Sequence, residues 1–241
     1  MRRNSHCGGL INSIHGAGPK GVITRNTPSN ILFSVVAVPL ALSQWTPIPI
    51  NSMTLPKFES AEKTWKITTK ENAGGMAWVF PKREHFDNPA IYWTWKVEQF
   101  PEVSTYSPLR KKGDDYALRV GTLISGDKEM DLPPELAKVA QKFSLKLSYI
   151  VFYLATDRKE WEGRCEPNPF SDRVLNCFRI TGKKFTDRTE RPLQDLSKAL
   201  NLSPTVQSKL SVAGLWVFAD SDNSKSQSVS YLKDLKVEGK P

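Results

Sequence analysis

Residues 91–97 read IYWTWKV, a stretch in which apolar and polar side chains alternate. The apolar set is Ile91, Trp93, Trp95 and Val97. The other set is Tyr92, Thr94 and Lys96. Because successive side chains of a strand point to opposite faces, this alternation predicts a strand with one buried and one solvated face.

Seven further segments show strand patterns. They are 63–69 (KTWKITT), 76–80 (MAWVF), 116–125 (YALRVGTLIS), 147–155 (LSYIVFYLA), 174–181 (VLNCFRIT), 213–219 (AGLWVFA) and 229–237 (VSYLKDLKV). Gly74 and Gly75 are expected to form a turn between the first two. The 147–155 segment is rich in β-branched and aromatic residues, which predicts a strand buried on both faces.

Two segments are predicted to be short helices, 134–142 (PELAKVAQK) and 192–200 (PLQDLSKAL). Each begins with proline and carries apolar residues at helical spacing. Most strands have no helix between them, which argues against an alternating α/β sheet. The sequence therefore predicts a mainly β fold, an antiparallel β-sandwich (jelly-roll-like) with one or two short helices in connections.

The N-terminal part resembles an export signal. Residues 31–42 read ILFSVVAVPLAL, an uncharged apolar run too short to span a bilayer, and Arg25 places a positive charge upstream. Ala41-Leu42-Ser43 is a small-x-small cleavage site, so we expect cleavage after Ser43. Alternatives are a translation start downstream, for example at Val22, an organellar transit peptide, or a buried strand over 31–42.

We accordingly expect an export leader over 1–43, a linker over 44–59 and one β-sandwich domain over 60–238. The protein is expected to be periplasmic or extracellular. Beyond the leader, no segment approaches the length of a membrane span, so no integral membrane segment is expected after its removal.

The charge balance is mildly basic. The 241 residues include 34 Lys and Arg and 25 Asp and Glu, a formal net charge of +9. Four of the basic residues and none of the acids precede residue 44, which leaves +5 for the rest. No basic stripe, zinc-finger spacing or aromatic RNA-binding signature is present, so nucleic acid is not an expected partner.

Two cysteines, Cys165 and Cys177, lie beyond the leader in EGRCEPNPFSDRVLNC. In an oxidising compartment they are able to form one disulfide that closes a short loop. Two unpaired buried thiols are the alternative.

Acidic residues cluster in two places. Gly113-Asp114-Asp115-Tyr116-Ala117-Leu118-Arg119-Val120 places two acids before a predicted strand, and on a strand Asp115 and Arg119 share a face. We expect these two side chains to border one polar cavity or to pair. The second cluster, Asp220, Asp222 and Asn223, ends the predicted strand 213–219.

Carboxylate and amide oxygens are the ligands that calcium prefers, so Asp220 and Asp222 are candidate metal ligands. A contiguous EF-hand loop is excluded, because its sixth position would be Lys225 rather than Gly and its twelfth Tyr231 rather than Glu. A site shared with Asp114 or Asp115 remains open, as does the simpler interpretation that these residues only cap strand ends.

The tryptophans Trp93 and Trp95 offer flat faces on which sugar rings stack, but their strand positions equally suit a hydrophobic core. If the protein is an enzyme, paired carboxylates suit glycan cleavage.

The ordered motifs IYWTWKVE, GDDYALRVG, LSYIVFYLA, PLQDLSKAL and GLWVFADSDNSKSQSVSYLKDLKV resemble domain-of-unknown-function family 3047, a bacterial family of exported proteins. The likeness covers residues 65–237. The matching positions are Trp93, Trp95 and Lys96; Asp114, Asp115, Arg119 and Val120; Asp220, Asp222 and Asn223; and Tyr231, Asp234 and Leu235. Ser224 replaces the family's usual Thr, and Tyr149-Ile-Val-Phe-Tyr departs from its frequent Tyr-x-Trp. The resemblance implies export and a sandwich-like β fold, and brings no known activity.

Three functions follow as hypotheses. The first is an exported ligand-binding β-sandwich that binds a carbohydrate, envelope glycan or small polar ligand. The residues expected to line or brace its site are Asp114, Asp115, Arg119, Asp220, Asp222, Asn223, Trp93 and Trp95. The second is a glycan hydrolase or lyase that uses paired aspartates. The third is a structural protein in which the acids form a calcium site or a hydrogen-bond network, and calcium is the one cofactor that the sequence suggests.

Overall fold

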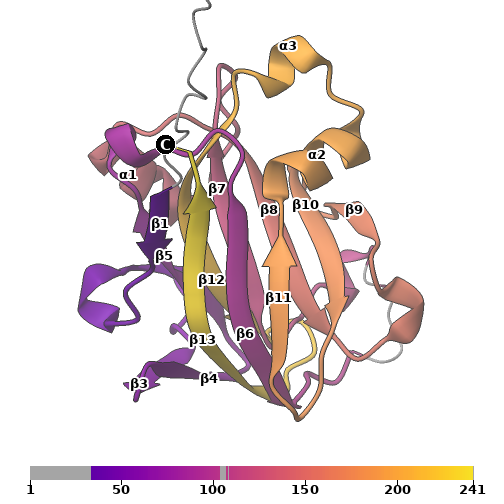
Figure 1. Ribbon diagram of the computed structural model, residues 1–241. Helices are drawn as coiled ribbons and strands as arrows, with labels where there is room; N and C mark the ends of the chain where they lie inside the picture. Colours follow the sequence, from indigo (N-terminus) through magenta and orange to yellow (C-terminus); the bar gives the residue numbers. More distant parts are fainter. Residues whose placement is uncertain (1–33, 104–106, 108, 241) are drawn as a thin grey trace, which may run out of the picture. The chain divides into compact units, whose positions relative to one another are not determined.

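The computed structural model describes residues 34–103, 107 and 109–240, and the fold is mainly β, with two sheets packed face to face (Figure 1). The apolar faces of both sheets share one core. It contains Trp65, Trp93 and Trp95 of the first sheet and Tyr153 and Val217 of the second, all 0–1% exposed. The predicted β-sandwich is therefore confirmed.

The first sheet has six strands. In order across the sheet they are β11 (Thr186–Glu190), β6 (Ala90–Gln99), β13 (Gln227–Gly239), β4 (Thr64–Lys70) and β3 (Lys57–Ala61), with β1 (Ser34–Ala37) paired to the end of β13. All its pairs are antiparallel. The alternation of IYWTWKV puts Trp93 and Trp95 inside and leaves Tyr92 and Lys96 half-exposed.

The second sheet has seven strands. They are β2 (Thr46–Pro49), β5 (Ala73–Val79), β12 (Ser211–Asp220), β7 (Arg119–Ser125), β8 (Leu147–Thr156), β10 (Ser171–Ile180) and β9 (Cys165–Asn168). One pair, β8 with β10, is parallel, so the expectation of a wholly antiparallel sandwich is corrected here. The strand β9 lies between them in the chain and forms the antiparallel edge beside β10.

The outer face of the second sheet carries a further hydrophobic cluster. It contains Phe152, Trp216 and Phe218 and is covered by the helix α1 (Pro134–Lys142) through Leu136 and Val139. This arrangement explains why every residue of β8 is buried, as the sequence predicts. The second predicted helix is α2 (Pro192–Leu200), which ends at Asn201 in the left-handed conformation and is followed by the short α3 (Pro204–Gln207).

Gly74 and Gly75 do not form the expected turn, because both lie inside β5. A Cβ atom at Gly75 would lie 2.3 Å from the carbonyl oxygen of Val217 and 2.6 Å from the indole nitrogen of Trp216. Glycine is therefore required at position 75 by the close approach of β12. The prediction of a turn at Gly74 and Gly75 is wrong.

The segment 44–59, expected to be a linker, contributes β2 to the second sheet and most of β3 to the first. Within the expected leader, residues 34–37 form β1. Residues 42 and 43 lie in the 3-10 helix η1 (Leu42–Gln44). Residues 1–33 of the predicted leader, with Arg25 and Val22, lie outside the described residues. In the part of the chain that the structure describes, no helix is long and apolar enough to cross a membrane.

Cys165 and Cys177 are joined by a disulfide between the neighbouring strands β9 and β10. Cys177 is fully buried, whereas Cys165 is half-buried. The bond therefore ties the edge strand β9 to the core.

We predict that the Cys165→Ser/Cys177→Ser double variant loses about 2–3 kcal/mol of unfolding free energy, because closing a short loop restricts the unfolded chain. Urea titrations of both proteins measure the loss, and the wild type in reducing agent should match the variant. Equal midpoints for oxidised wild type and variant would show that the bond contributes nothing.

Candidate functional site

The two acidic segments meet at one end of the second sheet, beside the start of β7 and the end of β12. The strands β7 and β12 are neighbours, with Arg119 directly opposite Phe218. The chain before Arg119 and the chain after Phe218 therefore run side by side. The backbone N–H of Asp220 donates to the carbonyl oxygen of Tyr116 at 3.0 Å, and the N–H of Tyr116 donates to Oδ1 of Asp220 at 2.7 Å.

Arg119 is the centre of this cluster and is 3% exposed. Its Nη2 donates to Oδ2 of Asp220 at 2.5 Å and to the carbonyl oxygen of Asp114 at 2.5 Å, while Nη1 lies 3.4 Å from Oδ2 of Asp114. The guanidinium also lies 4.8–5.7 Å from the ring centres of Tyr116, Phe152 and Phe218. A buried cation is thus held by two acids and three aromatic faces.

The expected pairing of Asp115 with Arg119 is wrong. The strand β7 begins at Arg119, and residues 114–118 are not in a strand, so the alternation on which the expectation rested does not apply. Asp114 is the partner instead, and Asp115 binds the loop after β12. Its carboxylate accepts bonds from the backbone N–H groups of Asn223 and Ser224, at 3.3 and 2.6 Å, and from the Asn223 side chain at 2.9 Å.

Negative charge exceeds positive charge in this buried cluster. Asp114, Asp115 and Asp220 are each no more than 5% exposed, and Arg119 is the cation among them. Burial raises the pKa of both Asp114 and Asp220, although Arg119 opposes the rise in each. Burial alone would lower the pKa of Arg119, but Asp114 and Asp220 raise it instead. The two carboxyls therefore bind a proton more readily in the folded protein than in the unfolded chain.

Three acids of the cluster are close enough to hold a metal ion. Asp115, Asp220 and Asp222 each offer a carboxylate oxygen within 4.8 Å of the others. Burial, followed by the charge of Asp115, raises the pKa of Asp222. However, the oxygens of Asp115 and Asp220 already accept N–H groups, which a cation would have to share. The distances fit a divalent ion, while the donors around them suit a self-contained hydrogen-bond network.

The structure does not bring Trp93 and Trp95 to this cluster. Both lie in the core between the sheets, where Trp93 contacts Tyr153 with ring centres 5.4 Å apart. Their exposed fractions are 1% and 0%. Their expected role in ligand binding is therefore corrected, because neither ring offers a face to a ligand.

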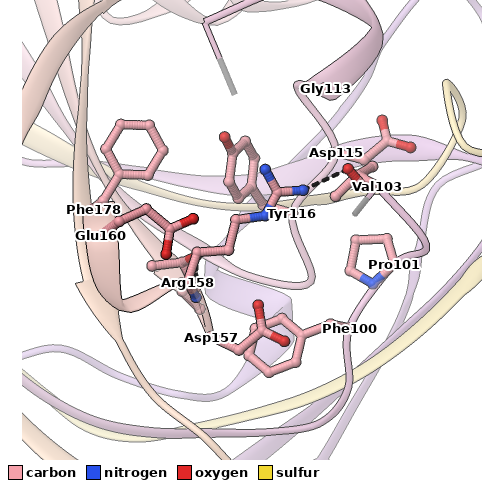
Figure 2. Close-up of a pocket in the computed structure, with 12 residues that line it drawn as sticks. Phe100, Pro101, Val103, Gly113, Asp115, Tyr116, Asp157, Arg158, Glu160 and Phe178 are labelled. Carbon is pink, nitrogen blue, oxygen red and sulfur yellow. Dashed lines mark hydrogen bonds between the residues drawn. The ribbon is translucent and has the colours of Figure 1, made fainter. Parts of the chain in front are cut away.

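A pocket of about 360 Å³ lies against the acidic cluster and shares Asp115 and Tyr116 with it (Figure 2). Its other walls come from the segment after β6, from the end of β8 and the residues that follow it, and from Phe178 of β10. Phe100 supplies a ring from the first, and Asp157, Arg158 and Glu160 come from the second. Arg158 donates a side-chain bond to the carbonyl oxygen of Val103, drawn as the dashed line in Figure 2.

Sequence reasoning missed most of this pocket. The overlooked residues are Phe100, Asp157, Arg158, Glu160 and Phe178. A usable signal was present, because the charged run TDRKE directly follows the buried strand LSYIVFYLA, as Asp220 follows GLWVFA. Charged residues that directly follow a buried strand therefore mark the end of the sheet at which the pocket lies.

The tyrosine between the cluster and the pocket has an unsatisfied hydroxyl. The Tyr116 side chain is 6% exposed, and its hydroxyl finds no hydrogen-bond partner among the described residues. Burial raises the pKa of this phenol, so it remains a neutral donor. Buried polar groups are usually paired, and an unpaired one beside a pocket points to a ligand or water there.

A sequence model for a family described as "protein of unknown function (DUF3047)" matches residues 43–236. The chain belongs to this family. The match spans both acidic motifs and confirms the DUF3047 resemblance that they indicated. No curated protein matches the chain in sequence.

Solved structures with a similar fold include carbohydrate-active proteins. The carbohydrate-binding module CBM29_1 from Piromyces equi is 11% identical, with 86% of this chain and 89% of that chain covered and a TM-score of 0.33. The xyloglucanase domain of NopAA from Sinorhizobium fredii, solved with cellobiose, is 7% identical, with 85% and 95% covered and a TM-score of 0.40. The family 12 endoglucanase 3 of Trichoderma harzianum is 7% identical, with 88% and 99% covered and a TM-score of 0.38. At these TM-scores the likeness carries no argument about this chain.

We predict that Arg119→Met destabilises the protein by about 3–5 kcal/mol, because it leaves buried Asp114 and Asp220 without a cation. Urea denaturation measures the change. Combining Arg119→Met with Asp114→Asn and Asp220→Asn should recover part of the loss, since the uncompensated charges are then gone. A loss below about 1 kcal/mol for the single variant would contradict the central role of the ion cluster.

We further predict a pH-dependent difference between the wild type and Asp114→Asn. The folded-state pKa of Asp114 is raised above its ordinary value of 3.8, so the folded protein binds the proton more tightly. This stabilisation is present below the unfolded pKa and is lost as pH rises through the folded pKa. The wild type should gain stability relative to Asp114→Asn between pH 7 and pH 4, by about 1.4 kcal/mol for each unit of pKa difference. Parallel stability curves over this range would show that Asp114 has no raised pKa.

Proposed function

We propose that this DUF3047 chain binds a neutral carbohydrate in the pocket beside the Arg119 cluster. The observation that carries the proposal is the combination of aromatic walls with hydrogen-bonding groups in one cavity. Phe100, Tyr116 and Phe178 supply the rings, while Asp157 and Glu160 supply carboxylates. Sugars present apolar C–H faces and many hydroxyls, and this pairing of surfaces suits both.

The size of the pocket supports a small ligand or one unit of a longer chain. A volume of about 360 Å³ lies at the lower end of the roughly 300–1,000 Å³ typical of ligand sites. We assign the buried hydroxyl of Tyr116, which has no partner among the described residues, as a donor to a sugar oxygen, and the carboxylates as acceptors from sugar hydroxyls. Both kinds of hydrogen-bonding partner that a hydroxyl needs are therefore present.

The charges of the pocket favour a neutral ligand over an acidic one. Three acids, Asp115, Asp157 and Glu160, line it together with one cation, Arg158, whose side chain already binds the carbonyl oxygen of Val103. An anionic glycan would bring its charge next to these carboxylates, at a cost in electrostatic free energy.

The geometry favours binding over hydrolysis by the acids that the motifs indicate. Asp114 and Asp220 both contact Arg119 and are almost fully buried, and Asp115 is bound to the loop at Asn223 and Ser224. A general acid must reach the proton that it transfers, and the oxygens of these carboxyls are already engaged by donors of the protein. We therefore assign the cluster to bracing the pocket wall, through Asp115 and Tyr116.

Export to the periplasm or extracellular space belongs to the same proposal. It is supported by the apolar run 31–42 and by Arg25 upstream of it, and it does not require that residues 34–42 be removed. Fractionation of cells that express the full chain with a C-terminal tag tests export, and recovery of the protein in the cytoplasm alone would contradict it.

Binding to a panel of neutral and acidic oligosaccharides, measured by calorimetry, tests the carbohydrate proposal. We predict that Phe100→Ala and Tyr116→Phe each weaken the binding of neutral oligosaccharides about tenfold, or about 1.4 kcal/mol. The first removes a ring surface and the second removes a single donor.

Phe143→Ala is the matched control, because Phe143 is a 44%-exposed phenylalanine that does not line the pocket. It should bind with unchanged affinity. Thermal melts of all three variants separate lost binding from lost folding. Absence of binding by the folded wild type to every neutral member of the panel would overturn the proposal.

A further inference from the structure

We infer that residues 34–42 stay in the folded domain as a structural segment, with the strand β1 (Ser34–Ala37) paired to the end of β13. The sequence marks this segment as the core of an export signal, to be removed after Ser43. In the structure it completes the first sheet. The inference concerns this segment alone and does not depend on the carbohydrate proposal.

The backbone of the segment continues the sheet. β1 pairs antiparallel with β13, with Ser34 opposite Gly239 and Ala37 opposite Lys236. The N–H of Val38 then donates to the carbonyl oxygen of Leu235 at 3.1 Å. On this side of β13, β4 pairs only with the residues up to Lys233. β1 pairs with the residues of β13 that lie beyond the end of β4.

The side chains alternate between core and solvent as they do in a built-in strand. Val38 is 6% exposed, and Val36 and Leu40 pack against the core between the sheets. Val35 is 59% exposed. Alternate side chains of the apolar run therefore face the core. The composition of the run alone does not tell the inward side chains from the outward ones.

Two buried tryptophans depend on this segment for their hydrogen bonds. The indole N–H of Trp45 donates to the carbonyl oxygen of Pro39 at 2.7 Å, and that of Trp65 donates to the carbonyl oxygen of Leu40 at 2.6 Å. Both rings are almost fully buried, at 4% and 0% exposure. Without the segment, each N–H would lose its acceptor, and an unsatisfied buried donor is unfavourable.

The bond expected to be cut lies inside folded structure. Ser43 is the middle residue of the 3-10 helix η1 (Leu42–Gln44), in which the N–H of Gln44 donates to the carbonyl oxygen of Ala41 at 3.0 Å. Proteases cleave exposed, extended segments far more readily than hydrogen-bonded ones. Cleavage after Ser43 must therefore precede folding, and a domain cut at this point would leave the end of β13 without its partner β1.

Two full-chain variants test the role of the segment. Val38→Asp places a charge in the core and should lower the melting temperature by about 5–15 °C, as a loss of a few kcal/mol does in a domain of this size. Val35→Asp is the matched control on the exposed side of the same strand and should melt as the wild type does. Equal melting temperatures for the two variants would overturn the inference.

A second experiment tests whether the segment stays bound to the domain. A flexible insert with a specific protease site, placed after Ser43 in the full chain, allows the folded protein to be cut in solution. We expect the N-terminal fragment to co-elute with the domain on gel filtration and the melting temperature to stay within a few degrees of the uncut protein. Release of the fragment with no change in melting temperature would overturn the inference, whatever the result of the oligosaccharide measurements.

Discussion

The guanidinium of Arg119 lies between the carboxylates of Asp114 and Asp220, and all three side chains are almost fully buried. A buried ion pair gains little unless its geometry satisfies the remaining donors and acceptors. Here the requirement is met partly by the chain itself, through the carbonyl oxygen of Asp114 and the backbone N–H of Tyr116. The start of β7 and the end of β12 are therefore fixed to one another by the same few atoms.

This constraint extends from the sheet to the pocket. Asp220 holds the backbone of Tyr116, and Asp115 holds the loop at Asn223 and Ser224. The wall of the pocket is thus bound on both sides by carboxylates that are themselves almost fully buried. A ligand site needs side chains in fixed positions, and acids that are fully engaged in internal bonds supply rigidity rather than reactivity.

Much of the fold is predictable from local pattern, and the exceptions have physical reasons. The eight strands and two helices expected from the sequence are present because each carries a strong apolar period or a proline at its start. The elements β2 (TPIP), β3 (KFESA), β9 (CEPN) and β11 (TDRTE) were missed. They lie at sheet edges, where proline and charged residues are favoured because they discourage pairing with other chains. Their strand character comes from the neighbour to which they bind.

The sequence is sufficient to predict which residues form the polar cluster, but not which aspartate pairs with Arg119. Acidic residues beside two buried strands indicate that these strand ends are neighbours. The structure brings together all the polar residues of both clusters, Asp114, Asp115, Arg119, Asp220, Asp222 and Asn223. Which aspartate meets Arg119 depends on where β7 begins, and alternation cannot decide between a start at Tyr116 and the observed start at Arg119. The pocket depends on four segments that follow no common pattern in sequence. The aromatic and charged walls of the pocket are therefore a property of the tertiary fold. They lie against an ion cluster whose residues the sequence does indicate.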